Sequence, residues 1–182
     1  LTVANGRTNY YRVAALDAFQ QESAESNTAA AAAQPFTSDT DFLEYLQRTA
    51  FEFFWYQANP TNGLVRDRSD PTSASSVAAT GFGLTAVGVA IDHGWITRTA
   101  GLARALTTLR TFHDAPQGDS VTGTIGYRGC FYHFLDMNTA LRMVSWDTEL
   151  STIDTALLLA GVLDVKQYFV VDDPTENQIR AL

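Results

Sequence analysis

The amino-acid sequence predicts a mainly α-helical fold, built as part of a toroid of helical hairpins, and three observations support this prediction. From residue 38 onward, apolar side chains recur at intervals of three and four, which is the period of a helix. Segments 77–93 and 151–169 are apolar on most faces, whereas segments 41–58 and 97–113 are amphipathic. Because a helix that is apolar all round is buried, we expect a buried inner ring of helices inside a half-exposed outer ring.

Four of the five predicted helices have a recognisable start. Ser38 with Asp41 can cap the first helix, and Thr97 can cap the third. Ser151 is placed to cap the fourth, and Asp173 followed by proline starts a fifth. The second helix contains too few glycines for a phosphate-binding loop, so its glycines indicate close packing between helices. An alternating aromatic run predicts a strand over 131–135 before the fourth helix.

The first 28 residues have a different composition and predict β-structure. Residues 8–16 alternate and are rich in aromatic and β-branched side chains, and a polar turn follows at 17–22. This stretch resembles the last strands of a fibronectin type III domain, in which Tyr10 or Tyr11 would form the tyrosine corner. Two strands are not stable alone, so we interpret residues 1–28 as the remnant of a β-sandwich that needs its other half.

The remaining boundaries follow from composition. Residues 29–37 are alanine-rich and predict a linker, and residues 38–182 form the predicted helical domain. The chain begins with Leu1 rather than methionine, and its fifth predicted helix starts only a few residues before Leu182. We therefore expect this chain to be an internal segment of a larger protein, holding the N-terminal part of a truncated toroid.

Composition excludes several classes of partner. The net charge of −8 and pI near 4.7 argue against nucleic acid, which needs a basic surface. No apolar run is long enough to cross a membrane. With one cysteine, Cys130, and three scattered histidines, the sequence predicts neither a metal site nor a bound cofactor. The oligomeric state is left open.

The candidate active site is the segment 146–154, just before the fourth helix. It places Trp146 beside three carboxylates, Asp147, Glu149 and Asp154. Sugar-cleaving sites need one carboxyl group to protonate the leaving oxygen and another to activate water, and a flat ring stacks on a pyranose face. Asp154 has an alternative role, because Ser151 and an acid three residues later also form a capping box.

Four further residues are candidates for substrate binding. Arg66 and Asp67 lie in a loop before the second helix, where they would either grip sugar hydroxyls or form a structural ion network. His133, with neighbouring Tyr132, either lines the pocket or is a core histidine. We expect Trp146 and the acids to converge within reach of Arg66 or Asp67 at the N-terminal ends of the inner helices.

Six sequence blocks, in order, resemble the bacterial glucoamylase-like family, which is itself related to the endo-β-1,2-glucanases. The blocks are residues 42–55, 62–69, 79–84, 93–97, 131–136 and 146–161. The resemblance implies an (α/α)6 glycoside hydrolase with its pocket at the N-terminal ends of the inner helices.

Residue by residue, the resemblance is partial. In the β-1,2-glucanase branch the last block carries an Asp-Leu-Val-Glu-Thr core. Here residues 151–155, Ser-Thr-Ile-Asp-Thr, stand in its place, so Asp154 matches the family's Glu and Ser151 replaces an Asp, whereas Asp147 matches another Asp of the family. Glu149 is typical of a branch with Glu-Leu-Ser-Thr. The family's general acid would lie on a later hairpin, outside this chain.

Three hypotheses for function remain open. The first is a glucan-degrading glycoside hydrolase, secreted or periplasmic, because fibronectin modules often accompany secreted bacterial carbohydrate enzymes; endo-β-1,2-glucanase would be one specific activity. The second is a non-catalytic carbohydrate-binding or adhesive protein. The third is a phosphorylase-like or lyase relative on the same toroid. In each case the partner is an oligo- or polysaccharide.

Overall fold

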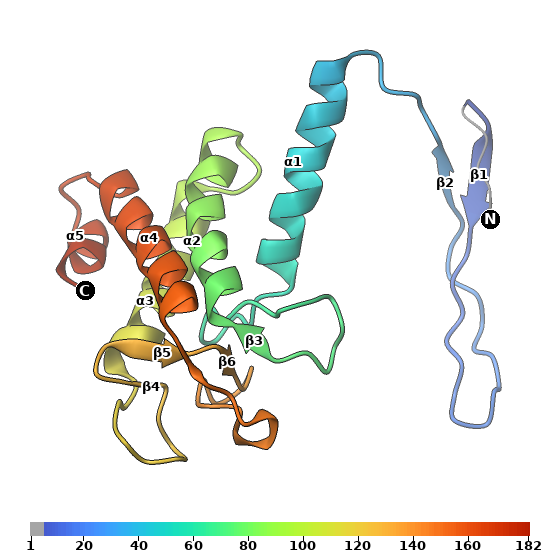
Figure 1. Ribbon diagram of the computed structural model, residues 1–182. Helices are drawn as coiled ribbons and strands as arrows, with labels where there is room; N and C mark the ends of the chain where they lie inside the picture. The colour runs from blue at the N-terminus through green and yellow to red at the C-terminus, as the bar shows by residue number, and fades with distance from the viewer. Residues whose placement is uncertain (1–5) are drawn as a thin grey trace. The chain divides into compact units, whose positions relative to one another are not determined.

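The computed structural model describes residues 6–182 and divides the chain into two compact units (Figure 1). One unit ends at Tyr45 and the other covers Leu46–Leu182. Helix α1 (Asp39–Tyr56) crosses this division, so its first turns belong to the first unit and the rest to the second.

The first unit contains a two-stranded antiparallel sheet. Strand β1 (Thr8–Tyr11) pairs with β2 (Ala29–Ala32), with Tyr11 opposite Ala29. The strand predicted over residues 8–16 is therefore confirmed for its first four residues. The expected linker 29–37 has to be corrected. Its first four residues form β2, because their backbone groups bond to β1 although alanine is a weak strand former. The fibronectin assignment stays a prediction.

Helices dominate the second unit, so the predicted mainly helical class is confirmed. They are α2 (Val77–Asp92), α3 (Arg98–Asp114), α4 (Thr152–Tyr168) and α5 (Pro174–Ala181), with the end of α1. The expected caps are present: the hydroxyl groups of Thr97 and Ser151 accept backbone N–H groups of the first turns, and the carboxylate of Asp173 does the same for α5. Ser76, which caps α2, was not singled out in the sequence.

Helices α2 and α4 are parallel neighbours (Figure 1). Gly81 approaches Leu157 near the helix starts, and Gly88 approaches Tyr168 near the ends. A Cβ on Gly81 would lie 2.5 Å from the Leu157 carbonyl oxygen, so only glycine permits this crossing. The predicted packing role of the glycines is confirmed, and both helices begin at the same end of the unit.

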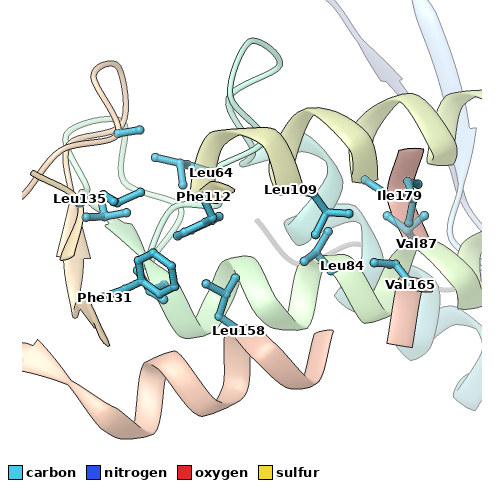
Figure 2. Close-up of a cluster of buried hydrophobic side chains, with 14 of the residues drawn as sticks. Leu64, Leu84, Val87, Leu109, Phe112, Phe131, Leu135, Leu158, Val165 and Ile179 are labelled. Atoms are coloured by element: carbon cyan, nitrogen blue, oxygen red, sulfur yellow. The ribbon is translucent and has the colours of Figure 1, made fainter. Parts of the chain in front are cut away.

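The core lies between α2, α3, α4 and α5 (Figure 2). The expectation for α2 is confirmed, since its buried residues include Val77, Leu84 and Val87. The expectation for α4 is confirmed against α1, whose only buried residue is Phe51, but not against α3, which is as buried as α4. One face of α4 packs on α2, while the opposite face exposes Ile153 and Leu163. The complete toroid stays a prediction.

Short strands connect the starts of α2 and α4. Strand β3 (Ser75–Ser76), which leads into α2, pairs with β6 (Phe134–Leu135). Strand β7 (Leu150–Ser151), which leads into α4, pairs with β5 (Cys130–Tyr132), and β5 pairs with β4 (Gly126–Tyr127) on its other side.

The predicted continuous strand over 131–135 is interrupted at His133. The backbone N–H of His133 donates to the Glu149 carbonyl at 3.0 Å, and its own carbonyl accepts from the Val77 N–H at 3.1 Å. The His133 backbone therefore forms one hydrogen bond to the segment that leads into α4 and another to the first residue of α2.

Candidate functional site

Three candidate residues meet where α2 and α4 begin. His133 Nδ1 lies 2.9 Å from Glu149 Oε1, and His133 Nε2 lies 3.8 Å from Asp154 Oδ1. The imidazole thus stands between two carboxylates. The side chain of Glu149 is 65% exposed, whereas that of Asp154 is 8% exposed. Glu149 is therefore accessible from solvent, whereas Asp154 is buried behind the imidazole.

The environment of Glu149 favours its ionised form. A hydrogen bond from its own backbone N–H, followed by the hydrogen bond to His133, lowers the pKa of this carboxyl group. At neutral pH, Glu149 is therefore a proton acceptor and a hydrogen-bond acceptor, not a proton donor.

Asp154 combines a structural role with a place in the cluster. The Ser151 hydroxyl accepts the Asp154 N–H at 3.2 Å and donates to Asp154 Oδ2 at 2.5 Å. This arrangement resembles the expected capping box, except that the acid returns to the Ser151 hydroxyl instead of its backbone N–H. The second carboxylate oxygen faces His133. The two sequence-based interpretations of Asp154 are therefore compatible.

An aromatic surface continues from the cluster. The ring of His133 stacks on Phe134, with centroids 3.8 Å apart and planes inclined by 18°. Phe134 meets Trp146 edge to face at 5.3 Å. The indole of Trp146 remains 46% exposed. Exposed aromatic surface next to an open carboxylate is what carbohydrate recognition requires.

Asp147 does not join the cluster. It has a left-handed backbone conformation with φ of 48°, and its side chain points into solvent. The nearest cation is the Arg142 guanidinium, at 3.6 Å. The expected convergence thus holds for Glu149 and Trp146 but not for Asp147, because the turn before Thr148 directs it away.

Arg66 and Asp67 also lie apart from the cluster. The Arg66 guanidinium donates to the carbonyl groups of Pro71 and Ser73 at 2.7 and 3.1 Å. The Asp67 carboxylate lies 3.3 Å from Arg68. The Arg66 contacts close the 66–75 loop on itself, so the structure favours a structural role for Arg66, through backbone carbonyl groups instead of an ion network. No contact of either side chain with the Glu149 cluster occurs among the described residues.

Tyr132 is a packing residue in this structure. Its ring is buried in the core, and the Arg142 guanidinium covers it at 4.6 Å. Sequence reasoning placed Tyr132 at the substrate because of its aromatic neighbours. Both Phe131 and Tyr132 are buried in the core, because each face of β5 is covered at this point.

The structure adds two residues that the sequence did not indicate, Arg142 and Thr148. Arg142 Nε donates to the Thr148 carbonyl at 2.8 Å, and the Thr148 hydroxyl donates to the Met143 carbonyl at 2.9 Å. Neither contact has a sequence signal, because both acceptors are backbone groups in an irregular loop.

Residues 6–182 contain no group of three or more His, Cys, Asp or Glu side chains arranged to hold a metal ion. No helix in this part of the chain combines the length and apolarity needed to cross a membrane.

Comparisons with known proteins agree with the helical fold. An exo-β-1,2-glucooligosaccharide sophorohydrolase of Parabacteroides distasonis is 30% identical over 179 residues, which is 96% of this chain and 23% of that protein. The crystal structure of a β-1,2-glucanase from the same species superposes with a TM-score of 0.84 at 29% identity, covering 97% of this chain and 24% of that one. The resemblance indicated by the sequence is confirmed.

A second structure extends the comparison to the glucoamylase-like group. A candidate glucoamylase of Bacteroides uniformis is 29% identical, with a TM-score of 0.70 over 81% of this chain and 35% of that one. No family model matches the chain. The chain spans about a quarter of the length of the Parabacteroides relatives.

Proposed function

We propose that the full-length protein containing this chain is a glycoside hydrolase that degrades glucans. The observation that carries the proposal is the cluster of Glu149, His133 and Asp154 next to the exposed Trp146. An ionised, accessible carboxylate beside an aromatic surface provides a proton acceptor and a platform for a sugar ring.

We further propose β-1,2-linked glucooligosaccharides as the substrate class. The relatives named as β-1,2-glucan hydrolases are similar along nearly the whole of this chain, and their similarity includes the site segment before α4. Endo and exo action would be separated by the products, since an endo enzyme releases a mixture of chain lengths early in the reaction.

In this proposal Glu149 activates the attacking water. Its carboxylate is ionised and exposed, so it can accept a proton from water, and the hydrogen bond to His133 fixes its orientation. Asp154 positions His133 from behind, and Trp146 stacks on a sugar ring. Inverting hydrolysis needs a second carboxyl group, as proton donor, about 6.5–9.5 Å from the base. We expect that acid on a later hairpin.

The setting of the enzyme is part of the proposal. We propose a secreted or periplasmic protein in which residues 1–28 belong to a fibronectin type III-like domain. The low lysine content and the paired strands β1 and β2 support this assignment. Protease accessibility in intact and permeabilised cells would test the location.

The test uses the full-length protein and its Glu149→Gln variant with β-1,2-glucooligosaccharides, measuring release of new reducing ends. We expect kcat/KM to fall by about 100-fold or more, because the variant keeps the shape but cannot accept a proton. Glu52→Gln is the matched control, since Glu52 is a half-exposed glutamate whose carboxylate likewise has a cationic partner, Arg48. A fall of less than about threefold would make Glu149 a surface acid.

The same assay separates the alternatives. Binding of the oligosaccharide without cleavage by the wild-type protein would favour a carbohydrate-binding protein. Product formation that depends on added phosphate would favour a phosphorylase. Either result would overturn the proposed hydrolase.

A further inference from the structure

The loop 143–149 is a closed unit that carries both Trp146 and Glu149. A short 3-10 helix, η1 (Val144–Trp146), forms its first half. Asp147 then turns the chain with a left-handed conformation, and its N–H donates to the Val144 carbonyl at 3.0 Å. The Thr148 hydroxyl closes the loop by donating to the Met143 carbonyl at 2.9 Å.

Arg142 lies at the base of this loop and contacts its second half. Its Nε donates to the Thr148 carbonyl at 2.8 Å, and its Nη2 lies 3.6 Å from the Asp147 carboxylate. The guanidinium carbon lies 4.6 Å from the centre of the Tyr132 ring. The side chain is only 14% exposed, so the Thr148 contact is largely protected from competing water.

The backbone of Arg142 is fixed independently of its side chain. Its N–H donates to the Thr124 carbonyl at 2.9 Å, and the next residue, Met143, donates to the Phe134 carbonyl at 3.2 Å. The guanidinium therefore extends from an anchored backbone and stacks on a buried ring. Thr148, the group it holds, directly precedes Glu149.

We propose that Arg142 is a positioning residue for the hydrolase proposed above. By holding the Thr148 carbonyl, it keeps Glu149 beside His133 and Trp146 against Phe134, although it touches none of these four side chains. The expected effect of Arg142 on catalysis rests on the proposed function, whereas its effect on the conformation of the loop does not depend on that function.

A guanidinium is required at this position, and lysine is not an equivalent. The planar fork can stack its face on Tyr132 while Nε points along its edge toward Thr148. A lysine ammonium keeps the positive charge near Asp147 but cannot satisfy both contacts at once. Arg142→Lys therefore separates geometry from charge.

The experiment compares Arg142→Lys with Arg104→Lys in the full-length protein. Arg104 is a matched control, because its guanidinium also stacks on an aromatic ring, Trp55 at 4.4 Å, and donates to a backbone carbonyl, that of Trp55 at 3.3 Å. Two quantities are measured: kcat/KM on β-1,2-glucooligosaccharides, and hydrogen exchange of the peptide covering residues 143–149.

For Arg142→Lys we expect kcat/KM to fall by about tenfold or more, because misplacement of reacting groups by an ångström has effects of this size. Exchange in the 143–149 peptide should become about tenfold faster, while the α2 and α4 peptides stay unchanged. Arg104→Lys should leave both the loop exchange and kcat/KM within about threefold of wild type, whatever it does to the melting temperature.

Unchanged exchange in the loop would overturn the inference, and so would faster exchange with unchanged kcat/KM. If Arg142→Lys does not fold, Arg142→Met replaces it and is judged by the same two readouts, since it keeps an unbranched stem over Tyr132 and removes the donor to the Thr148 carbonyl. Wild-type protein without hydrolytic activity would refute the proposed function, and loop exchange would still test whether Arg142 holds the loop.

Discussion

Replacing Gly81 by alanine tests the close crossing of α2 and α4. Helix propensity alone predicts that Gly81→Ala stabilises the protein by about 0.5–1 kcal/mol. The structure predicts the opposite sign. The new Cβ would lie 2.5 Å from the Leu157 carbonyl oxygen and 2.7 Å from the Leu158 Cα, and these are backbone atoms that cannot rotate away.

The helices must therefore separate, and overpacking of this kind costs about 1–3 kcal/mol or more. After subtraction of the propensity gain, we expect Gly81→Ala to lower the free energy of unfolding by about 1–2 kcal/mol. Denaturant unfolding of the full-length protein followed by circular dichroism measures this change. Thr85→Ala, at an exposed position of the same helix, should change stability by less than about 0.7 kcal/mol. A Gly81→Ala protein as stable as wild type would refute the tight crossing.

Two further predictions concern ionisable groups. Removing the imidazole with His133→Leu, which has no hydrogen-bonding group, should move the acid limb of the kcat/KM profile to higher pH, because the Glu149 carboxyl group loses one of the two hydrogen bonds that lower its pKa; an unmoved limb would contradict the proposed base. Glu176 is buried against Arg98 at 2.8 Å, and its pKa is lowered chiefly by that hydrogen bond. Its contribution to stability is thus present above the ordinary glutamate pKa and is lost as the pH falls through the lowered value. Glu176→Gln should lower the free energy of unfolding by about 1–2 kcal/mol at pH 7. This loss is smaller than for a fully buried ion pair, because Arg98 is partly solvated. The variant should also flatten the acid part of the stability profile measured by urea unfolding, and an equally steep profile would contradict the linkage.

The sequence was sufficient for elements whose physical causes are local. Helix starts at Thr97, Ser151 and Asp173 could be predicted because a capping side chain bonds within three residues of itself. The sequence could predict that Gly81 packs closely against another helix, since an apolar helix with glycines indicates close packing. Its partner, α4, could not be deduced from that pattern alone.

The sequence named the members of the Glu149 cluster together with other residues that lie apart from it, and it did not give the geometry. Glu149, Asp154 and His133 were all candidates, yet only the break between β5 and β6 places the imidazole between the two acids. Asp147 shares the same short segment as Glu149, but the left-handed turn directs it elsewhere. Arg142 was missed because its partners are a backbone carbonyl and the face of a buried ring, and neither has a characteristic sequence spacing.

The parallel arrangement of α2 and α4 has an electrostatic consequence. Both helices begin at the same end of the unit, so two macrodipoles direct their positive ends, each equivalent to about half an elementary charge, toward one region. Glycoside cleavage passes through a transition state with oxocarbenium character, which is cationic. Two aligned positive ends would oppose such a cation. The carboxylates of Glu149 and Asp154 lie near these helix starts, where their negative charge offsets that field. Removing the Glu149 charge would take away the proposed proton acceptor, and removing the Asp154 charge would take away the group that positions His133. Either change would also leave the positive helix ends without compensation.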